Sequence, residues 1–198
     1  MKIFLTIALV ALATNSPSWL RADDQIKDTS PDGKFAMLLT QPEEGGVKIQ
    51  LIEVSSRKAV LDLAEIGHFG PHAEDWEILW APDSKRFAFY EPNRRGGDTT
   101  VYLRNESGFT ESPLPELDDC ATAAQKKELK AKGLNKSIEN DTVPKEWLKS
   151  GALVVVNDQG WQTNGGPLRG CTQTVTIGFD AKHKASVVRV AGKESKEY

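Results

Sequence analysis

Short apolar runs separated by polar turns recur along most of the chain. Residues 47–54 and 173–180 alternate between apolar and polar positions, a period-two pattern that predicts strands with one buried face. Further apolar runs occupy 35–40, 59–63, 76–80, 87–90, 100–104, 109–114, 152–156 and 186–190. Short strands with turn signals at roughly 8 to 12 residue intervals predict a mainly β, antiparallel fold.

Two related turn segments divide these strands into units. Residues 30–34 read SPDGK, and 51 positions further along residues 81–85 read APDSK. Proline restricts φ, aspartate hydrogen-bonds to nearby backbone amides and glycine accepts a positive φ, so both segments predict tight turns in front of strands. A weaker copy, WLKSG, occupies residues 147–151. We therefore predict about three units of turn and strands.

One segment departs from the strand pattern. Asp118 or Asp119 can cap a helix, and Gly133 suits its C-terminal end. We predict one helix near residues 119–132. It should lie on the surface of the β domain, because its apolar face is thin and depends mainly on Leu129. Residues 135–144 are predicted to form a polar connection after the helix, and residues 192–198 are predicted to fray.

The order of turn, strand, loop and strand resembles the TolB-type β-propeller repeat. Residues 30–34 match the S-P-D-G-K turn of that family fully. Residues 80–85 match it with two substitutions and include the tryptophan that commonly precedes the turn. The resemblance covers residues 28–117 well and 147–190 poorly, so it comprises two clear units and a degenerate third.

The resemblance implies a fold and a role. Closed propellers have about 4 to 8 blades, whereas this chain has room for about three units. The expected fold is therefore an incomplete propeller or a twisted β-sandwich, which stays open or closes by self-association. Members of the family serve as periplasmic interaction scaffolds or as gating domains on peptidases. We expect the scaffold role, because the peptidase form needs an attached hydrolase domain.

The first residues are typical of an export signal. Lys2 precedes residues 3–13, which are apolar apart from one threonine. This run has about 11 residues, whereas a membrane-spanning helix needs roughly 20. We predict a signal peptide at 1–22 with cleavage after Ala22, a single β-rich domain at 23–198, no membrane span after signal removal, and a periplasmic or secreted location. A retained N-terminal anchor helix is the alternative.

Charge and cysteine content narrow the partners and the compartment. The net charge is −3, and an acidic chain argues against nucleic acid, which needs a clustered basic face. In an exported chain the pair Cys120 and Cys171 predicts a disulfide. Closing a loop of about 50 residues contributes on the order of 4 kcal/mol in the chain-entropy model. A redox or metal-binding thiol pair is the alternative, although the two lack C-x-x-C spacing.

A histidine-containing loop is the candidate for metal binding. His68 and His72 are four residues apart, with Glu74 and Asp75 close behind. On a helix this spacing can bind one metal ion, but the intervening glycine and proline exclude a helix. We predict no metal and no other cofactor, and keep His68, His72 and Asp75 as candidate ligands should the loop gather them. The alternative interpretation is a polar loop between strands.

A second loop is the candidate for partner binding. Trp161, Asn164 and Arg169 lie in a glycine-rich segment, residues 159–170, which is too long for a simple hairpin. Long loops on β scaffolds often bind partners, and an exposed aromatic ring beside arginine suits a protein or glycan contact. We predict these three as binding residues. The alternative is that Trp161 closes the end of the core and Cys171 holds the loop in place.

A third charged loop, residues 94–98 (RRGGD), suits an anionic partner or is simply a charged turn. The chain contains no G-x-S-x-G elbow, P-loop or dinucleotide-binding glycine pattern. We therefore predict an exported, non-enzymatic binding or scaffold module of the cell envelope. The alternatives are a small secreted hydrolase or metal-dependent enzyme that uses the loop of His68 and His72, and a self-associating structural envelope protein.

Overall fold

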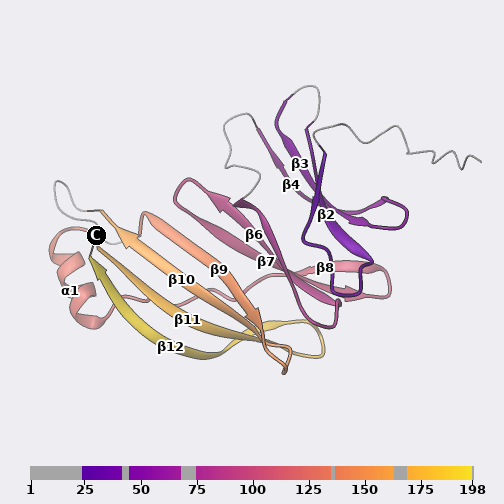
Figure 1. The fold of residues 1–198 in the computed structure, drawn as a ribbon. Coiled ribbons are helices and arrows are strands. Elements are labelled where there is room, and N and C mark those ends of the chain that lie inside the picture. The colour runs from indigo at the N-terminus through magenta and orange to yellow at the C-terminus, as the bar shows by residue number, and fades with distance from the viewer. Residues whose placement is uncertain (1–23, 42–44, 68–74, 135–136, 163–168, 198) are drawn as a thin grey trace, which may run out of the picture.

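A computed structural model describes most of the chain (Figure 1). The described residues are 24–41, 45–67, 75–134, 137–162 and 169–197. Within these ranges the chain is mainly β, with two sheets and one helix, and the strands do not close into a barrel. The predicted fold class is therefore confirmed.

The first unit forms a four-stranded antiparallel sheet with the strand order β1-β2-β3-β4. Each strand pairs with the next along the chain. Its strands are β1 (Gln25–Lys27), β2 (Phe35–Thr40), β3 (Val47–Glu53) and β4 (Ala59–Ile66).

The second and third units share one eight-stranded sheet, ordered β12-β11-β10-β9-β7-β6-β5, with β8 paired to β7. The second unit comprises β5 (Glu77–Trp80), β6 (Arg86–Asn93), β7 (Gly96–Asn105) and β8 (Gly108–Ser112). The third comprises β9 (Glu139–Trp147), β10 (Leu153–Trp161), β11 (Arg169–Phe179) and β12 (Ala185–Glu197). Helix α1 (Ala123–Ala131) connects the two units. They are joined by a short parallel pairing between β7 and β9, whereas the other strand pairs are antiparallel.

The middle unit packs against both of its neighbours. On β6, Phe87 and Phe89 contribute to the core shared with the first unit, whereas Ala88 contributes to the core shared with the third. On β7, Tyr102 contributes to the core shared with the first unit and Val101 to the core shared with the third. Because side chains alternate across a strand, burial on both faces requires a continuous apolar run. This explains why residues 87–90 show no polar alternation.

Equivalent turns follow the first strand of each of the first two units. The amide of Ser30 donates to the carbonyl of Phe35 at 2.8 Å, and that of Ala81 donates to Arg86 at 2.9 Å. The fourth turn residue has a positive φ in both, 71° at Gly33 and 55° at Ser84. Ser84, at the position of Gly33, adds a contact: its Oγ accepts a hydrogen bond from the amide of Asp32, at 3.0 Å. The two turns are therefore directly linked.

A tryptophan hydrogen bond repeats between successive units. Trp80 Nε1 donates to the carbonyl of Asp28 at 2.7 Å, and Trp147 Nε1 donates to that of Leu79 at 3.0 Å. Each accepting carbonyl lies two residues before the preceding turn. The degenerate segment at 147–151 thus occupies the structural position of the two clear turns.

Helix α1 lies in the predicted region but begins differently. Its N-cap is Thr122, which forms a capping box with Gln125, so the prediction that Asp118 or Asp119 caps the helix was wrong. The carboxylate of Asp119 instead accepts from the amide of Ala121 at 2.7 Å.

Within the described ranges, no helical segment has the length and apolar character that a membrane crossing requires.

Two strand predictions at the C-terminal half were also wrong. Residues 135–144 were expected to form a polar connection, but β9 begins at residue 139. Residues after 191 were expected to fray, but β12 continues to residue 197. Both segments are largely polar and become strands by pairing with a neighbour, β9 with β10 and β12 with β11.

Candidate functional site

A charged pocket lies where the hairpin between β6 and β7 approaches β9 and β10. Its volume is about 300 Å³, at the lower end of the range of about 300–1,000 Å³ for small-molecule sites. The lining residues are Arg94, Arg95, Gly96, Glu139, Asp141, Asp158, Gln159 and Gly160. The pocket is therefore formed jointly by the second and third units.

Glycines allow the backbones to approach closely at this pocket. Gly96 has a φ of 129°, and a Cβ atom there would collide with the carbonyl of Asn140. A Cβ at Gly97 would collide with the ring of Tyr90. The amide of Asn140 donates to the carbonyl of Arg95 at 3.0 Å, so the hairpin is attached to β9 through its backbone. The pocket walls are consequently held by main-chain contacts rather than by side chains alone.

A buried hydrogen bond forms one side of the site. The hydroxyl of Tyr90 donates to Asp141 Oδ1 at 2.7 Å. Burial raises the pKa of Tyr90, and the charges of Asp141, Asp75 and Asp98 raise it further. Burial also raises the pKa of the Asp141 carboxyl, although the Tyr90 hydrogen bond opposes that shift. The tyrosine therefore stays protonated and holds one oxygen of Asp141 in place.

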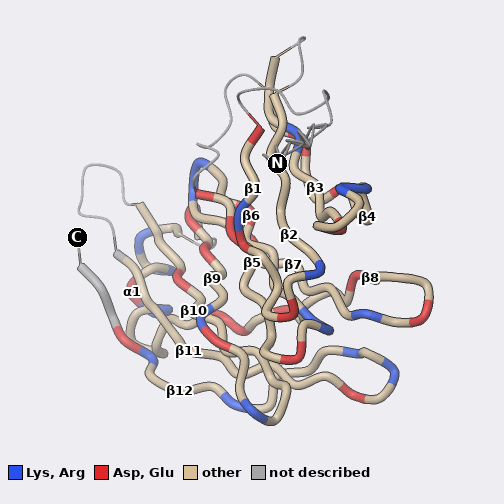
Figure 2. The backbone as a smooth tube through the Cα atoms, turned by 45° about the vertical axis from the view of Figure 1, so that its right-hand side comes forward, with Lys and Arg blue, Asp and Glu red and all other residues tan. Residues whose placement is uncertain are grey.

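Charges of both signs line the pocket. Asp141 and Asp158 are register partners in the β9–β10 ladder, so both carboxylates lie on one face. Arg94 and Arg95 form the exposed tip of the β6–β7 hairpin. Their guanidinium groups make no hydrogen bond or ion pair with the described part of the chain. Figure 2 shows basic and acidic residues close together along this part of the backbone. The arrangement suits binding of charged groups rather than covalent chemistry.

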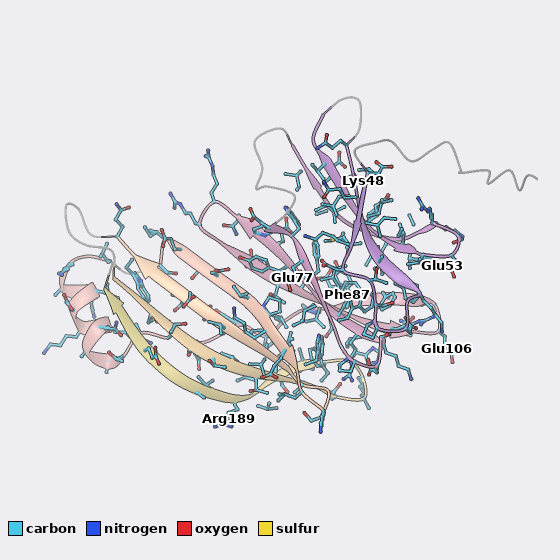
Figure 3. All side chains as sticks on the ribbon, in the orientation of Figure 1. Lys48, Glu53, Glu77, Phe87, Glu106 and Arg189 are labelled. Carbon is cyan, nitrogen blue, oxygen red and sulfur yellow. A yellow bond between two sulfur atoms is a disulfide. The ribbon has the colours of Figure 1, made fainter. Side chains whose placement is uncertain are left out.

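A second cavity of about 420 Å³ lies between the turn after β3 and the β7–β8 hairpin. Phe35 and Phe109 line it, and Arg104 lies over the Phe35 ring at 4.9 Å from its centroid. Figure 3 labels Glu53 and Glu106, which line it at this end of the molecule. Because Arg104 is already held against aromatic rings, we take the charged pocket as the stronger candidate site.

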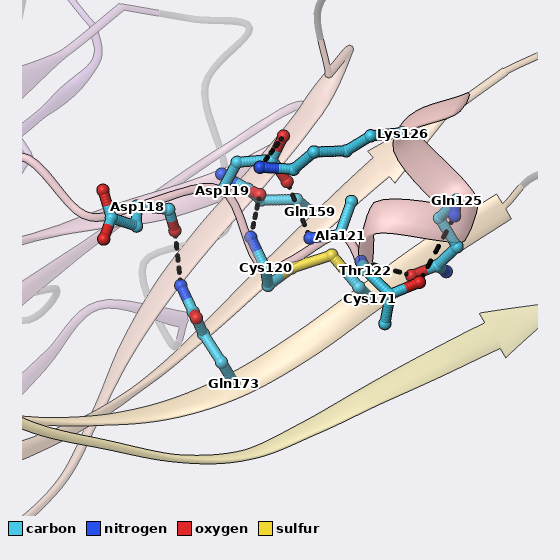
Figure 4. Close-up of polar contacts among 10 residues, drawn as sticks. All are labelled: Asp118, Asp119, Cys120, Ala121, Thr122, Gln125, Lys126, Gln159, Cys171 and Gln173. Carbon is cyan, nitrogen blue, oxygen red and sulfur yellow. Dashed lines mark hydrogen bonds and ion pairs between the residues drawn. A yellow bond between two sulfur atoms is a disulfide. The ribbon is translucent and has the colours of Figure 1, made fainter. Parts of the chain in front are cut away.

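The predicted disulfide is confirmed: Cys120 and Cys171 are bonded (Figure 4). Hydrogen bonds flank it, from the amide of Cys120 to Gln159 Oε1 at 3.0 Å and from Gln173 Nε2 to the carbonyl of Asp118 at 2.5 Å. A nine-residue helix is marginal by itself in water. The disulfide and these bonds therefore hold the α1 segment against β10 and β11.

The structure describes two of the three predicted binding residues. Trp161 is only 4% exposed and packs against the disulfide and Leu129. It is therefore not the exposed aromatic ring that we expected, and its position matches the alternative that it closes the end of the core. Asn164 lies outside the described residues, and Arg169 begins β11, opposite Trp161 in the ladder. A binding role for the three stays a prediction.

The predicted metal candidates are only partly described. His68 and His72 lie outside the described residues, whereas Asp75 is exposed just before β5. Its charge contributes to the raised pKa of Tyr90, so Asp75 acts electrostatically on the charged pocket. Among the residues that the structure describes, no group of three His, Cys, Asp or Glu side chains is placed to hold a metal ion.

The sequence pattern did not indicate most residues of the charged pocket. The loop at 94–98 was noted for its charge, and its paired glycines were the available signal for close backbone approach. Asp141 carried no such signal, because residues 135–144 were expected to be a connection. Tyr90 lies within a short run, residues 87–90, that predicts a strand without indicating a site, and Asp158 follows the run at 152–156.

Comparison with family models, curated proteins and solved structures gives no match. The resemblance to the TolB-type repeat therefore stays a prediction.

Proposed function

We propose that this chain is an exported, non-enzymatic binding module of the cell envelope that presents the charged pocket to a protein or glycan partner. The observation that carries the proposal is the pocket itself. It combines the guanidinium groups of Arg94 and Arg95, which make no ion pair with the described part of the chain, with the carboxylates of Asp141 and Asp158, on a backbone fixed by strand pairing. Such a patterned arrangement of charge supports specific recognition.

The disulfide supports the export part of the proposal. A bond between Cys120 and Cys171 is compatible with an oxidising compartment. Periplasmic or secreted location is consistent with the signal-like sequence at 1–22. The TolB-type resemblance, with its interaction scaffolds, favours the same role, as an analogy at the level of fold.

Self-association is a second candidate, favoured by the distribution of exposed apolar side chains. Among the described residues, the exposed large hydrophobic side chains are Ile26, Val54, Val60, Val187, Val188 and Val190, none of them from the middle unit. End units of repeat arrays usually present polar outer faces. Strand β12 nevertheless has two irregularities in its pairing and carries Arg189 (Figure 3). Bulges and charges protect a sheet edge from pairing, so we rank this role second.

The test is a capture experiment with a matched control. The full chain, purified with its disulfide intact, is immobilised and exposed to envelope extract of its source organism, and bound molecules are identified by mass spectrometry. The double variant Arg94→Gln/Arg95→Gln removes the pocket cations, whereas Lys182→Gln alters an exposed turn elsewhere. We expect one stoichiometric partner that the control retains and the double variant loses.

Two results would overturn this proposal. A partner bound equally by the native chain and the double variant would place recognition elsewhere. Recovery of the chain itself alone, together with a solution mass of two or more copies, would establish the self-associating role instead.

A further inference from the structure

We infer that the pocket binds a small zwitterionic ligand, with the size and charge pattern of a dipeptide. This inference rests on the proposed binding function and specifies its ligand class. The ligand's carboxylate binds Arg94 and Arg95, and its ammonium group binds Asp141, with the charges of Asp158 and Glu139 beside it. The cations come from the β6–β7 hairpin and the carboxylates from the β9–β10 ladder, so the two charges are held by different units.

The cationic wall is available for a ligand. Arg94 and Arg95 are adjacent in a two-residue connection between β6 and β7, and Arg95 is oriented by a bond from its amide to Asn93 Oδ1 at 2.8 Å. Neither guanidinium has a partner in the described chain. Arginine donates in a fork that matches a carboxylate, often through two parallel bonds. This wall therefore fits an anionic group.

The anionic wall is positioned independently of the ligand. Tyr90 holds Asp141 through Oδ1, and Oδ2 of the same carboxylate accepts no hydrogen bond from a described residue. Asp158 is the register partner of Asp141, and Glu139 lines the same cavity. An ammonium group has three donors, which suits several carboxylate oxygens at once. This wall therefore fits a cationic group.

Because the pocket has both a cationic and an anionic wall, it favours a ligand that carries charges of both signs. A simple anion would meet repulsion from Glu139, Asp141 and Asp158, and a simple cation would meet repulsion from the two arginines. Unfavourable charge contacts of this kind contribute to specificity as much as favourable ones. A ligand with one charge of each sign at its two ends is the one that satisfies both walls.

The pocket is small, and backbone contacts hold its walls in place. A volume of about 300 Å³ admits a small molecule or the end of a larger partner's chain. Gly96 and Gly97 let the hairpin lie directly against β9 and Tyr90, so the walls are already in place before binding. Preorganisation of this kind lowers the ordering cost of binding.

The test compares three probes built on the same dipeptide, which differ in their end charges, by calorimetry on the full chain. Alanyl-alanine carries both charges, N-acetyl-alanyl-alanine only the negative charge, and alanyl-alanine amide only the positive charge. We expect alanyl-alanine to bind at least about tenfold more tightly than either singly charged probe, because each lost charge pair is a charge-assisted interaction. Arg95→Gln and Asp158→Asn should each weaken it by a similar factor, and Lys182→Gln should leave it unchanged.

The outcomes separate this inference from the proposed function. Equal binding of the three probes, or binding of none, would overturn the zwitterionic ligand. If the envelope partner is still captured through Arg94 and Arg95 in that case, the binding function stands without it. If alanyl-alanine binds and no partner depends on the arginines, the pocket is a small-molecule site and the proposed protein or glycan recognition fails. Unchanged thermal unfolding of the variants excludes misfolding as the cause.

Discussion

The two junctions between successive units differ in how they are built. At the junction between the first and second units, aromatic rings pack closely: Phe35 of the first unit lies 5.2 Å from Phe109 and 6.3 Å from Trp80 of the second, measured between ring centroids. The junction between the second and third units has smaller side chains, such as Ala88, Val101 and Val155. It also contains the β7–β9 backbone pairing and the charged pocket.

This difference in packing indicates different roles for the two junctions. Large aromatic side chains bury more area and dominate the energetics of a core. Backbone pairing fixes the second junction with less side-chain volume, and it leaves polar groups at one end of the junction that are not used for packing. We infer that the first junction mainly stabilises the chain, whereas the second provides the binding site.

The largest expected effect comes from emptying the aromatic junction. Phe87 is 0% exposed and contacts three aromatic rings. Phe87→Ala should lower the free energy of unfolding by about 3–5 kcal/mol, through lost burial and the remaining cavity. Denaturant titration followed by tryptophan fluorescence measures this. Val188→Ala, at a side chain 60% exposed on β12, is the control and should change stability by less than about 0.5 kcal/mol. Comparable losses in both variants would contradict the role of the aromatic junction.

A paired substitution compares the two junctions directly. Trp80→Phe and Trp147→Phe each remove the indole N–H that donates to a carbonyl of the preceding unit. Loss of a partly buried hydrogen bond should cost about 1–3 kcal/mol in each variant, since the carbonyl is left without its partner. Trp147→Phe also weakens the contact with Arg86, which lies 5.4 Å from the indole centroid. Equilibrium unfolding of both variants measures the two losses.

Equal losses would support equivalent units at both junctions. A loss confined to Trp80→Phe would show that the third unit is held by strand pairing alone, and the repeat would then extend over two units.

The smallest expected effect is on the pH dependence of stability. Burial raises the pKa of Asp141 above its ordinary value of 3.8, so the folded chain binds this proton more tightly than the unfolded chain. The contribution of this group to stability is present below the ordinary pKa and is lost as the pH rises through the folded-state pKa. Asp141→Asn retains an acceptor for Tyr90 and removes the titration. The variant should therefore become more stable relative to the native chain as the pH rises toward neutrality.

Asp62 in the first unit is the matched control for this measurement. Hydrogen bonds from Gln50 and then from Lys48 lower the pKa of Asp62. Its contribution is present above the ordinary pKa and is lost as the pH falls through the folded-state value. Asp62→Asn should thus show the opposite trend in unfolding titrations between acidic and neutral pH. Parallel pH profiles for the two variants would contradict the assignment of a buried, unfavourable carboxylate to the pocket.

Local sequence accounts for the architecture of the first two units. The turns at 30–34 and 81–85 are specified by proline, aspartate and a residue that tolerates positive φ, and these preferences act over a few residues. The alternation at 47–54 sets which face of β3 is buried. The cysteine pair allowed a single intramolecular disulfide, because each of two cysteines has only the other as a partner within the chain.

The third unit and the pocket depended on contacts between distant segments. Residues 139–147 (ENDTVPKEW) lack strand alternation, and they form β9 because β10 pairs with them on one side. Trp161 lies in a glycine-rich stretch that predicts an exposed loop, but the α1 segment, attached by the disulfide, covers it. Neither result can be read from neighbouring residues, because the partner lies far along the chain.

By itself, then, the sequence determined the turns, the strand periodicity of the first two units and the disulfide, since each depends on local backbone preference or on residue count. Only the tertiary structure decided that Arg94 and Arg95 line one pocket with Asp141 and Asp158, across more than 40 residues of intervening chain. Local preferences act within a few bonds, whereas the meeting of the two charged walls depends on how the units stack and on the close approach that Gly96 permits.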